Sequence, residues 1–172
     1  PGKSFILHVG SCLPRKNRKL LLDMVSNISA NWDGDICYAG EAADEDLLEH
    51  MHRLGLQERV TFVVRPDHTT LVALYSSCEA FIFPSFSEGF GWPIIEAQAC
   101  GAPVVASSIE PMPEISGGAA LHADPHKAEE FAAAFASLQN KEIRCKVVQN
   151  GFSNARRFET RQMIQSYLDM YV

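Results

Sequence analysis

Five short apolar runs, each separated from the next by a longer segment, constrain the fold of this chain most strongly. The runs are FILHVG (5–10), DICYAG (35–40), VTFVV (60–64), AFIFPS (80–85) and PVVASS (103–108). Continuous apolar runs of this length are typical of parallel strands buried on both faces, and each such strand needs a crossover connection, usually a helix. The pattern therefore predicts an open, doubly wound α/β sheet.

The connecting segments carry helix signals. LLLDMVSNI (20–28) has apolar residues at helical spacing, DEDLLEHMHRLG (44–55) opens with acidic residues and closes on Gly55, and TTLVALYSSC opens on Thr69 as its cap. After Pro113 the pattern predicts three further helices, HKAEEFAAAFASLQ, EIRCKVVQNGFSNARRF and ETRQMIQSYLDMYV, with breaks near Asn140 and Thr160. We therefore expect one sheet domain followed by C-terminal helices.

Composition narrows the class of protein. The 172 residues, 47% of them hydrophobic, suffice for one well-cored domain, and a net charge of -6 gives no basic footprint for nucleic acid. The five cysteines are scattered, with no C-x-x-C pair, which predicts reduced, mostly buried thiols. No apolar run approaches the roughly 20 residues of a membrane span, and the start lacks a signal peptide pattern. We expect a cytoplasmic domain excised from a longer polypeptide.

Ligands of open α/β sheets bind at the carboxyl ends of the strands, so the turns after strands are the candidate sites. The turn after Gly10 bunches four cations near the start of the following helix, predicted near Asn17; they are Arg15, Lys16, Arg18 and Lys19. Cations there oppose the helix dipole unless an anion lies nearby. The turn therefore suggests a diphosphate site, with a solvated basic turn as the alternative; Walker and dinucleotide motifs are absent.

A second turn, PSFSEGFGWPIIEAQACGAP, is the most informative segment. Gly89 and Gly91 flank Phe90 where a strand passes into a helix, so backbone N–H groups can approach a ligand closely. Glu88 in the loop and Glu96 about one turn into the helix could bind hydroxyls at different points of one extended polyol. For Glu96 alone, an ordinary acid near a helix start is the alternative.

These two turns resemble those of a known family. SEGFGWPIIEAQACGAPVVAS resembles the Glu, seven residues, Glu signature of family-4 retaining glycosyltransferases, and VGSCLPRKN resembles their phosphate-binding turn. The resemblance runs from about Phe5 to the final YLDMY. It implies that residues 1–172 are one Rossmann-like C-terminal donor-binding domain, half of a GT-B fold, and that an N-terminal acceptor domain is absent from this chain.

The resemblance also implies roles for single residues. Glu88 would contact the hydroxyls of the donor sugar, Lys16 with Arg15 would neutralise the diphosphate leaving group, and Glu96 would hold the ribose. The family often has an arginine where this chain has Ser11, so Arg15 or Arg18 would substitute for it. The remaining expected donor contacts are Gly10, Ser11, Gly40, Glu41, Val64, Arg65, Pro66, Gly89, Phe90, Gly91 and Trp92.

The implied activity is transfer of a hexose, by analogy mannose, from a nucleotide sugar such as GDP-mannose or a UDP-sugar to the hydroxyl of a glycan or lipid-linked acceptor, with retention of configuration. Polysaccharide biosynthesis is the implied process, and membrane contact would be peripheral, through the missing domain. Neither cofactor nor metal is expected. The alternatives are a noncatalytic nucleotide-binding or interaction module and a sugar-nucleotide epimerase on the same fold.

Several other polar motifs are discounted. The D-x-D sequence of Asp33 and Asp35 precedes a strand, so it should lie at the sheet edge opposite the site and not bind metal. His8 falls inside a strand, where a core histidine is expected. Trp32 and Trp92 are expected to serve in packing. Trp92 also follows the turn that contains Gly89 and Gly91, so it could contact the donor.

Overall fold

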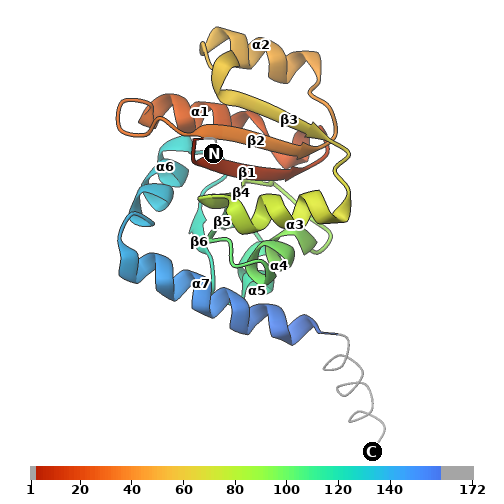
Figure 1. Cartoon of the computed structure of the whole chain (residues 1–172), viewed down its shortest axis with the longest axis vertical. Helices are drawn as coiled ribbons and strands as arrows, with labels where there is room; N and C mark the ends of the chain where they lie inside the picture. Colours follow the sequence, from red (N-terminus) through yellow and green to blue (C-terminus); the bar gives the residue numbers. More distant parts are fainter. Residues whose placement is uncertain (1–2, 160–172) are drawn as a thin grey trace, which may run out of the picture.

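The computed structural model describes residues 3–159, which form one parallel sheet of six strands in the order β3-β2-β1-β4-β5-β6. Every neighbouring pair is parallel. The strands are β1 (Phe5–Gly10), β2 (Asp35–Gly40), β3 (Val60–Val64), β4 (Ala80–Phe83), β5 (Val104–Ser107) and β6 (Leu121–Ala123). The chain winds outward from β1 to one edge and then returns to β4 beside β1, which makes the sheet doubly wound, as predicted (Figure 1).

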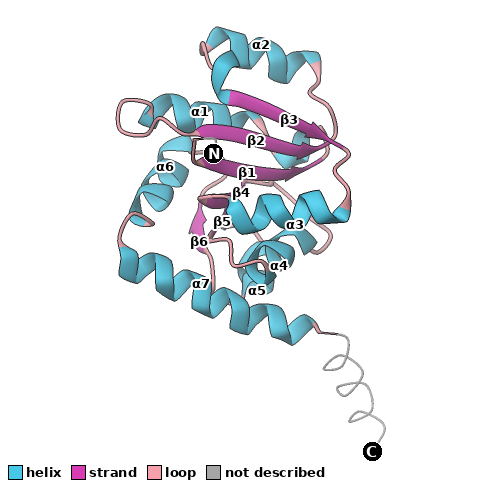
Figure 2. Ribbon diagram, viewed as in Figure 1, coloured by secondary structure: helices cyan, strands magenta, loops and turns pink. Residues whose placement is uncertain are grey.

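Helices connect the strands and cover both faces of the sheet (Figure 2). They are α1 (Lys19–Ile28), α2 (Glu45–Arg53), α3 (His68–Ser77), α4 (Trp92–Ala99), α5 (Met112–Ser116), α6 (Ala128–Ser137) and α7 (Lys141–Ala155), with 3-10 turns at Pro14–Lys16, Gln57–Arg59 and Arg156–Phe158. Helix α7 packs on α4 and α6 packs on α1. No helix among residues 3–159 is both long and apolar enough to cross a bilayer.

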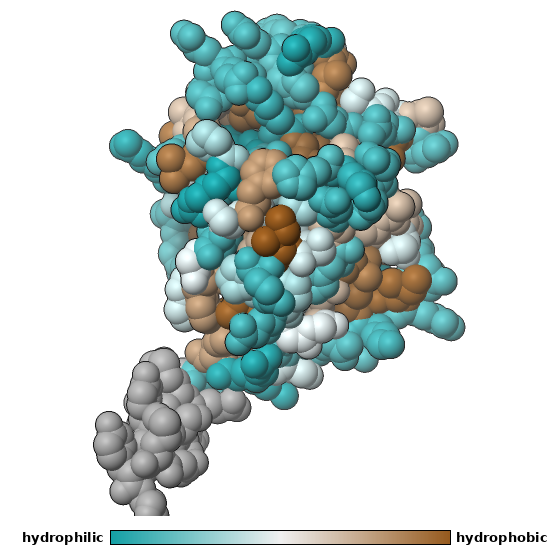
Figure 3. All heavy atoms as spheres, turned by 180° about the vertical axis from the view of Figure 1, so that it is seen from behind, coloured by the Kyte–Doolittle hydropathy of each residue, from teal (hydrophilic) through white to brown (hydrophobic). Residues whose placement is uncertain are grey.

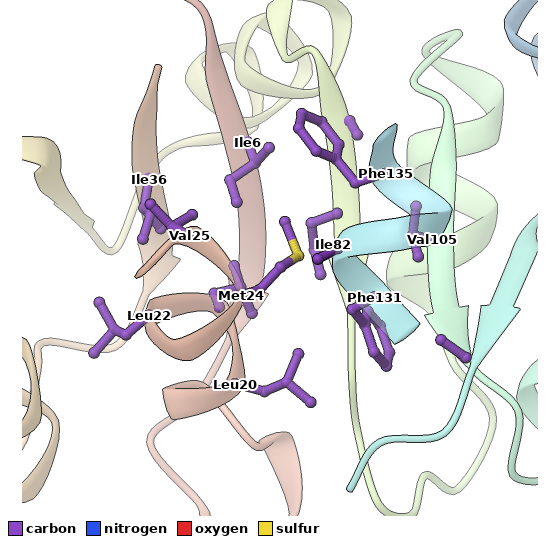
Figure 4. Close-up of a cluster of buried hydrophobic side chains, with 14 of the residues drawn as sticks. Ile6, Leu20, Leu22, Met24, Val25, Ile36, Ile82, Val105, Phe131 and Phe135 are labelled. Carbon is purple, nitrogen blue, oxygen red and sulfur yellow. The ribbon is translucent and has the colours of Figure 1, made fainter. Parts of the chain in front are cut away.

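Alternating strand residues build two separate cores. Ile6 points into the core shared with α1, α2 and α6, where Met24 and Phe131 are fully buried (Figure 4). Leu7, the next residue, points to the opposite face, into the core shared with α3, α4 and α5. Because both faces of the central strands are buried, the strands are apolar throughout, as the sequence pattern indicated.

Several elements differ from the sequence prediction. Strand β6 and helix α5 were not predicted, and α3 is capped by Asp67, which accepts a hydrogen bond from the backbone N–H of Thr70, so the prediction of Thr69 as the cap was wrong. All five cysteines are free, but only Cys37 and Cys78 are buried. The prediction that most of the thiols are buried was therefore also wrong. The final predicted helix lies, after Glu159, outside the described residues.

Seen from behind, the surface is largely hydrophilic and carries separate brown apolar patches (Figure 3). Across the described ranges, the large apolar side chains that remain exposed are Leu13, Val64, Val72, Trp92, Ile109, Ile143 and Phe152. Leu13, Val64 and Trp92 follow or end strands at the carboxyl edge of the sheet. The exposed apolar side chains at that edge therefore lie in or next to the turns that the sequence indicates as candidate sites.

A buried polar network fixes α4, the helix that carries Glu96. The side-chain amide of Asn154 on α7 donates to Gln98 Oε1 at 2.7 Å and to the carbonyl of Ile115 at 2.8 Å. Gln98 in turn donates to the carbonyls of Ser116 and Ala119. Asn154 is 5% exposed and Gln98 is 1% exposed. Since buried amides are strongly stabilised by such bonds, the network locks α4 against α5 and α7.

Replacement of Asn154 by alanine should lower the free energy of unfolding by about 2–3 kcal/mol, because it leaves the Gln98 and Ile115 oxygens without their donor in a buried setting. Urea denaturation followed by circular dichroism measures the change. Asn150→Ala, at an exposed position one turn earlier on α7, should change stability by less than about 0.5 kcal/mol. Equal unfolding midpoints for the two variants would contradict a stabilising network.

Candidate donor-binding site

The carboxyl ends of β1 and β2 meet at two glycines. Gly10 and Gly40 are register partners, and Gly40 has a φ of 123°. A Cβ on Gly40 would lie 2.4 Å from the carbonyl oxygen of Gly10, which is closer than real Cβ contacts. The two strand ends can therefore approach each other only with glycine at position 40.

A cavity of about 380 Å³ opens beside these glycines. Its lining gathers the ends of β1, β2 and β3 with one residue of α3: Val9, Gly10, Ser11, Gly40, Glu41, Arg65, Pro66 and Leu71. Of the predicted donor contacts, it brings together Gly10, Ser11, Gly40, Glu41, Arg65 and Pro66. Val64 ends β3 with 51% of its surface exposed and does not line this cavity.

Two charged residues of this cavity are held by backbone contacts. Glu41 Oε2 accepts a hydrogen bond of 2.9 Å from the backbone N–H of Cys12. The backbone N–H of Arg65 donates to the carbonyl of Gly40 at 2.8 Å, and Arg65 has a φ of 49°, in the left-handed region that favours glycine. Both residues thus project their side chains from fixed backbone positions.

A second cluster joins the turn after β1 to the turn after β4. Lys16 Nζ lies 2.7 Å from Glu88 Oε1, and an Arg15 guanidinium nitrogen lies 2.7 Å from Glu88 Oε2. Arg15 also donates to the carbonyl of Ser87 at 3.1 Å, and its own carbonyl accepts from the N–H of Phe86. The structure therefore brings together the three residues predicted to act on the sugar and the diphosphate.

Burial makes these contacts strong. The side chains of Lys16 and Glu88 are 10% and 7% exposed, whereas that of Arg15 is 42% exposed. Burial alone would raise the pKa of the Glu88 carboxyl, but hydrogen bonds from Lys16 and Arg15 outweigh it and hold the pKa below its usual value. Glu88 is therefore an anion at neutral pH, with cations on both of its oxygens.

The four cations of the basic turn do not act together. Helix α1 begins at Lys19, because Asn17 adopts a left-handed φ of 52° and bonds through its amide to the carbonyls of Pro84 and Pro125. Arg18 then turns inward, 6% exposed, with its guanidinium 4.7 Å from the centre of the Tyr38 ring. Lys19 pairs with Asp46. Of these four cations, Arg15 and Lys16 contact Glu88, so of the two residues expected to substitute for the missing arginine, Arg15 lies in this cluster and Arg18 does not.

The glycine turn ends at the start of α4. Gly91 precedes the helix with a φ of 109°, and no side chain caps the first N–H groups of the helix. Pro93 occupies the first turn, where it needs no backbone donor. A Cβ on Gly89 would meet nothing within 4 Å, so packing does not require glycine there. The uncapped amino end of α4 next to Glu88 is suited to an anionic or hydroxyl-rich ligand.

Glu96 lies in α4 and faces a different partner. Its Oε2 accepts a hydrogen bond of 3.0 Å from the hydroxyl of Tyr75 on α3. Burial raises the pKa of Tyr75 far above its usual range, so the hydroxyl stays protonated and donates. Leu71, one turn before Tyr75, lines the cavity between β1 and β3. Glu96 itself does not line this cavity; its hydrogen bond to Tyr75 ties it to the helix that supplies Leu71. Tyr75 was missed by sequence reasoning, since one tyrosine in an amphipathic helix gives no signal.

The two tryptophans differ in their packing and in their exposure to solvent. Trp32 packs against Phe135 and donates to Glu79, as predicted. Trp92 lies against Phe90, with a distance of 4.7 Å between the ring centroids, but it is 57% exposed, so its packing is only partial. The indole thus stands open to solvent at the amino end of α4.

The discounted polar residues serve structural roles. His8 is fully buried, bonds to the carbonyl of Ile82, and has its pKa lowered to about 3, chiefly by burial, so it is neutral. Asp35 begins β2, at the edge of the sheet opposite the strand ends that form the site. Within residues 3–159, no group of three or more histidine, cysteine or acidic side chains is placed to hold a metal ion.

Comparison with known proteins identifies the family. Residues 1–154 match the model of the glycosyl transferases group 1. The chain is 32% identical to an O-antigen chain mannosyltransferase B of Escherichia coli, covering 96% of this chain and 46% of that protein, and 32% identical to a D-inositol 3-phosphate glycosyltransferase of Rhodococcus opacus, covering 84% and 35%. The chain thus spans less than half the length of these relatives.

Solved structures agree on the fold. The Anabaena protein HepE in complex with UDP and glucose superposes with a TM-score of 0.87 at 22% identity, over 99% of this chain and 48% of that one. The C-terminal domain of a group 1 glycosyl transferase, LpcC of Francisella tularensis, superposes with a TM-score of 0.79 at 22% identity, over 92% and 87%. The Rossmann-like fold of the GT-B enzymes is therefore confirmed, and the chain belongs to the group 1 glycosyl transferases.

Proposed function

We propose that this chain is the donor-binding half of a family-4 glycosyltransferase, which transfers a hexose from a nucleotide sugar to an acceptor hydroxyl with retention of configuration. Two observations support a half enzyme: the chain matches less than half of its curated relatives, and it matches most of a domain described as C-terminal. An amino-terminal domain would then bring the glycan or lipid-linked acceptor. The similarity to a mannosyltransferase supports mannose as the sugar and polysaccharide biosynthesis as the process.

The observation that carries this proposal is the contact of Glu88 with both Lys16 and Arg15 at the uncapped start of α4. A donor whose diphosphate lies on the two cations would place its sugar beside the Glu88 carboxylate. Carboxylates accept hydrogen bonds from sugar hydroxyls, and cations in a partly buried cleft stabilise the charge that develops on a departing diphosphate. The backbone of Gly89, Phe90 and Gly91 would complete the cradle.

The remainder of the donor would extend along the strand ends. Glu96, oriented by Tyr75, is suited to bind the two hydroxyls of a ribose, because one carboxylate can accept from both. The cavity that contains Gly10, Ser11, Gly40 and Arg65 would then receive the base. The acceptor hydroxyl would attack the sugar carbon on the face that the diphosphate leaves, and its proton would pass to the departing diphosphate, so the configuration is retained.

Replacement of Lys16 by alanine should weaken binding of a nucleoside diphosphate by about tenfold to a hundredfold, the range expected for loss of one charge-assisted hydrogen bond, and should leave binding of the nucleoside unchanged. Calorimetric titration with GDP, UDP, ADP and GDP-mannose, and with the matching nucleosides, measures both effects. Lys19→Ala is the matched control, because Lys19 belongs to the same turn but pairs with Asp46.

Two results would count against the phosphate role of Lys16. One is an equal loss of affinity for nucleoside and diphosphate; the other is an equal loss in the Lys19→Ala control. If no nucleotide binds to the unaltered chain at millimolar concentration, the proposed donor site itself is wrong.

Replacement of Glu96 by alanine should weaken binding of a ribonucleoside diphosphate by about tenfold, because two hydroxyl donors lose their acceptor. The 2′,3′-dideoxy analogue lacks those hydroxyls, so its affinity should be the same for the variant and the unaltered chain. Calorimetry with both ligands measures the difference. A loss of the same size for the dideoxy analogue would remove the ribose assignment of Glu96.

A further inference from the structure

The cavity between the ends of β1, β2 and β3 combines opposite charges with apolar side chains. Glu41 and Arg65 are its only fully charged lining residues among those described, and Val9, Pro66 and Leu71 supply its apolar surface. Apolar walls suit the faces of a planar ring, whereas a carboxylate and a guanidinium suit polar groups on its edges. A cavity of this composition can discriminate between heteroaromatic rings by their edges.

The carboxylate of Glu41 is preorganised for this purpose. Its Oε2 accepts a hydrogen bond of 2.9 Å from the backbone N–H of Cys12, which leaves Oε1 without a partner among the described residues. An ionised carboxylate is an acceptor only, so a ligand must present N–H donors to it. The side chain of Glu41 is otherwise exposed, and a bound ring would shield it from water.

The Arg65 side chain, in contrast to that of Glu41, requires hydrogen-bond acceptors on the ligand. Its backbone is held in the left-handed region by its bond to Gly40, a conformation in which glycine would be less strained. An arginine is present instead, and its side chain forms neither an ion pair nor a hydrogen bond within residues 3–159. The guanidinium offers a fork of N–H donors, so it suits a ring edge with two neighbouring acceptors.

Of the common bases, only guanine has both an edge with two neighbouring donors and an edge with two neighbouring acceptors. Its N1–H and 2-amino group form a pair of neighbouring donors, and its O6 and N7 form a pair of neighbouring acceptors of the kind that arginine binds bidentately. Adenine pairs its N7 acceptor with an amino donor, and uracil and cytosine offer no edge with two neighbouring donors. We infer that this cavity selects a guanine nucleotide, with Glu41 on the donor edge and Arg65 on the acceptor edge.

This inference rests on the proposed donor site and specifies its base. Two analogues separate the contacts. IDP lacks only the 2-amino group of GDP, and 7-deaza-GDP lacks only the N7 acceptor. The unaltered chain should bind GDP at least tenfold more tightly than UDP and ADP, and about tenfold more tightly than IDP and 7-deaza-GDP.

Two variants test which residue contacts which edge of the guanine ring. Glu41→Gln keeps an acceptor for the Cys12 N–H but adds a donor, so it should abolish the preference for GDP over IDP and keep the preference over 7-deaza-GDP. Arg65→Gly is compatible with the left-handed backbone and should do the reverse. A thermal unfolding curve for each variant shows that a lost preference is not a lost fold.

The outcomes distinguish this inference from the proposed function. Equal affinity for GDP, UDP and ADP, together with a loss in Lys16→Ala, would overturn guanine selection and leave the donor site intact. Tighter binding of UDP or ADP than of GDP would overturn it as well. Binding of none of these nucleotides would overturn both.

Discussion

The ion pair between Lys16 and Glu88 connects the two halves of the sheet at the point where its winding reverses. Strands β1 and β4 are neighbours, yet the chain leaves β1 toward one edge of the sheet and leaves β4 toward the other. In open α/β sheets, ligands bind at such a switch point. The 2.7 Å contact of Lys16 with Glu88 joins the turn after β1 to the turn after β4 at this point.

This pair also explains how buried charges are tolerated before any ligand binds. A lysine and a glutamate that are each about nine-tenths buried would be strongly destabilising alone, but together they compensate one another, and Arg15 adds a second cation. The cluster of two cations and one anion carries a net positive charge at the start of α4, where the helix dipole is also positive. The diphosphate of the proposed donor would balance this positive charge.

Sequence reasoning succeeded where the signal was local and failed where it depended on packing. The ends of β1, β2 and β3 matched the apolar runs. For β1 and β2 the reason is that strands buried on both faces must be apolar, whereas β3 lies at the sheet edge and is only partly buried. Strand β6 was missed because it has three residues, Leu121–Ala123, at the sheet edge, and only Ala123 is buried. The candidate residues Glu88, Lys16 and Arg15 were found from their places in the turns after strands and from the resemblance to family-4 glycosyltransferases. Their mutual contact follows from the strand order, which spacing alone does not determine.

The position of Arg18 shows the same limit. Four consecutive or near-consecutive cations suggest one basic face, but a single left-handed residue, Asn17, ends the 3-10 turn and redirects the chain. The bonds that hold Asn17 reach Pro84 and Pro125, more than 60 residues away, so no local pattern could reveal them. The Arg18 guanidinium is buried against Tyr38, whereas Arg15 and Lys16 contact Glu88.

The described site has two parts, one formed by strands β1 to β3 and the other by β4 and α4. Strands β1 to β3 supply the cavity with Glu41 and Arg65, and β4 with α4 supplies Glu88, the glycine turn and Glu96. Only the turn after β1 contributes to both, through Gly10 and Ser11 on one side and Arg15 and Lys16 on the other. Residues in the first part can change without disturbing the ion pair that organises the second. A fold divided in this way can keep one arrangement for sugar and diphosphate while the other half varies with the base.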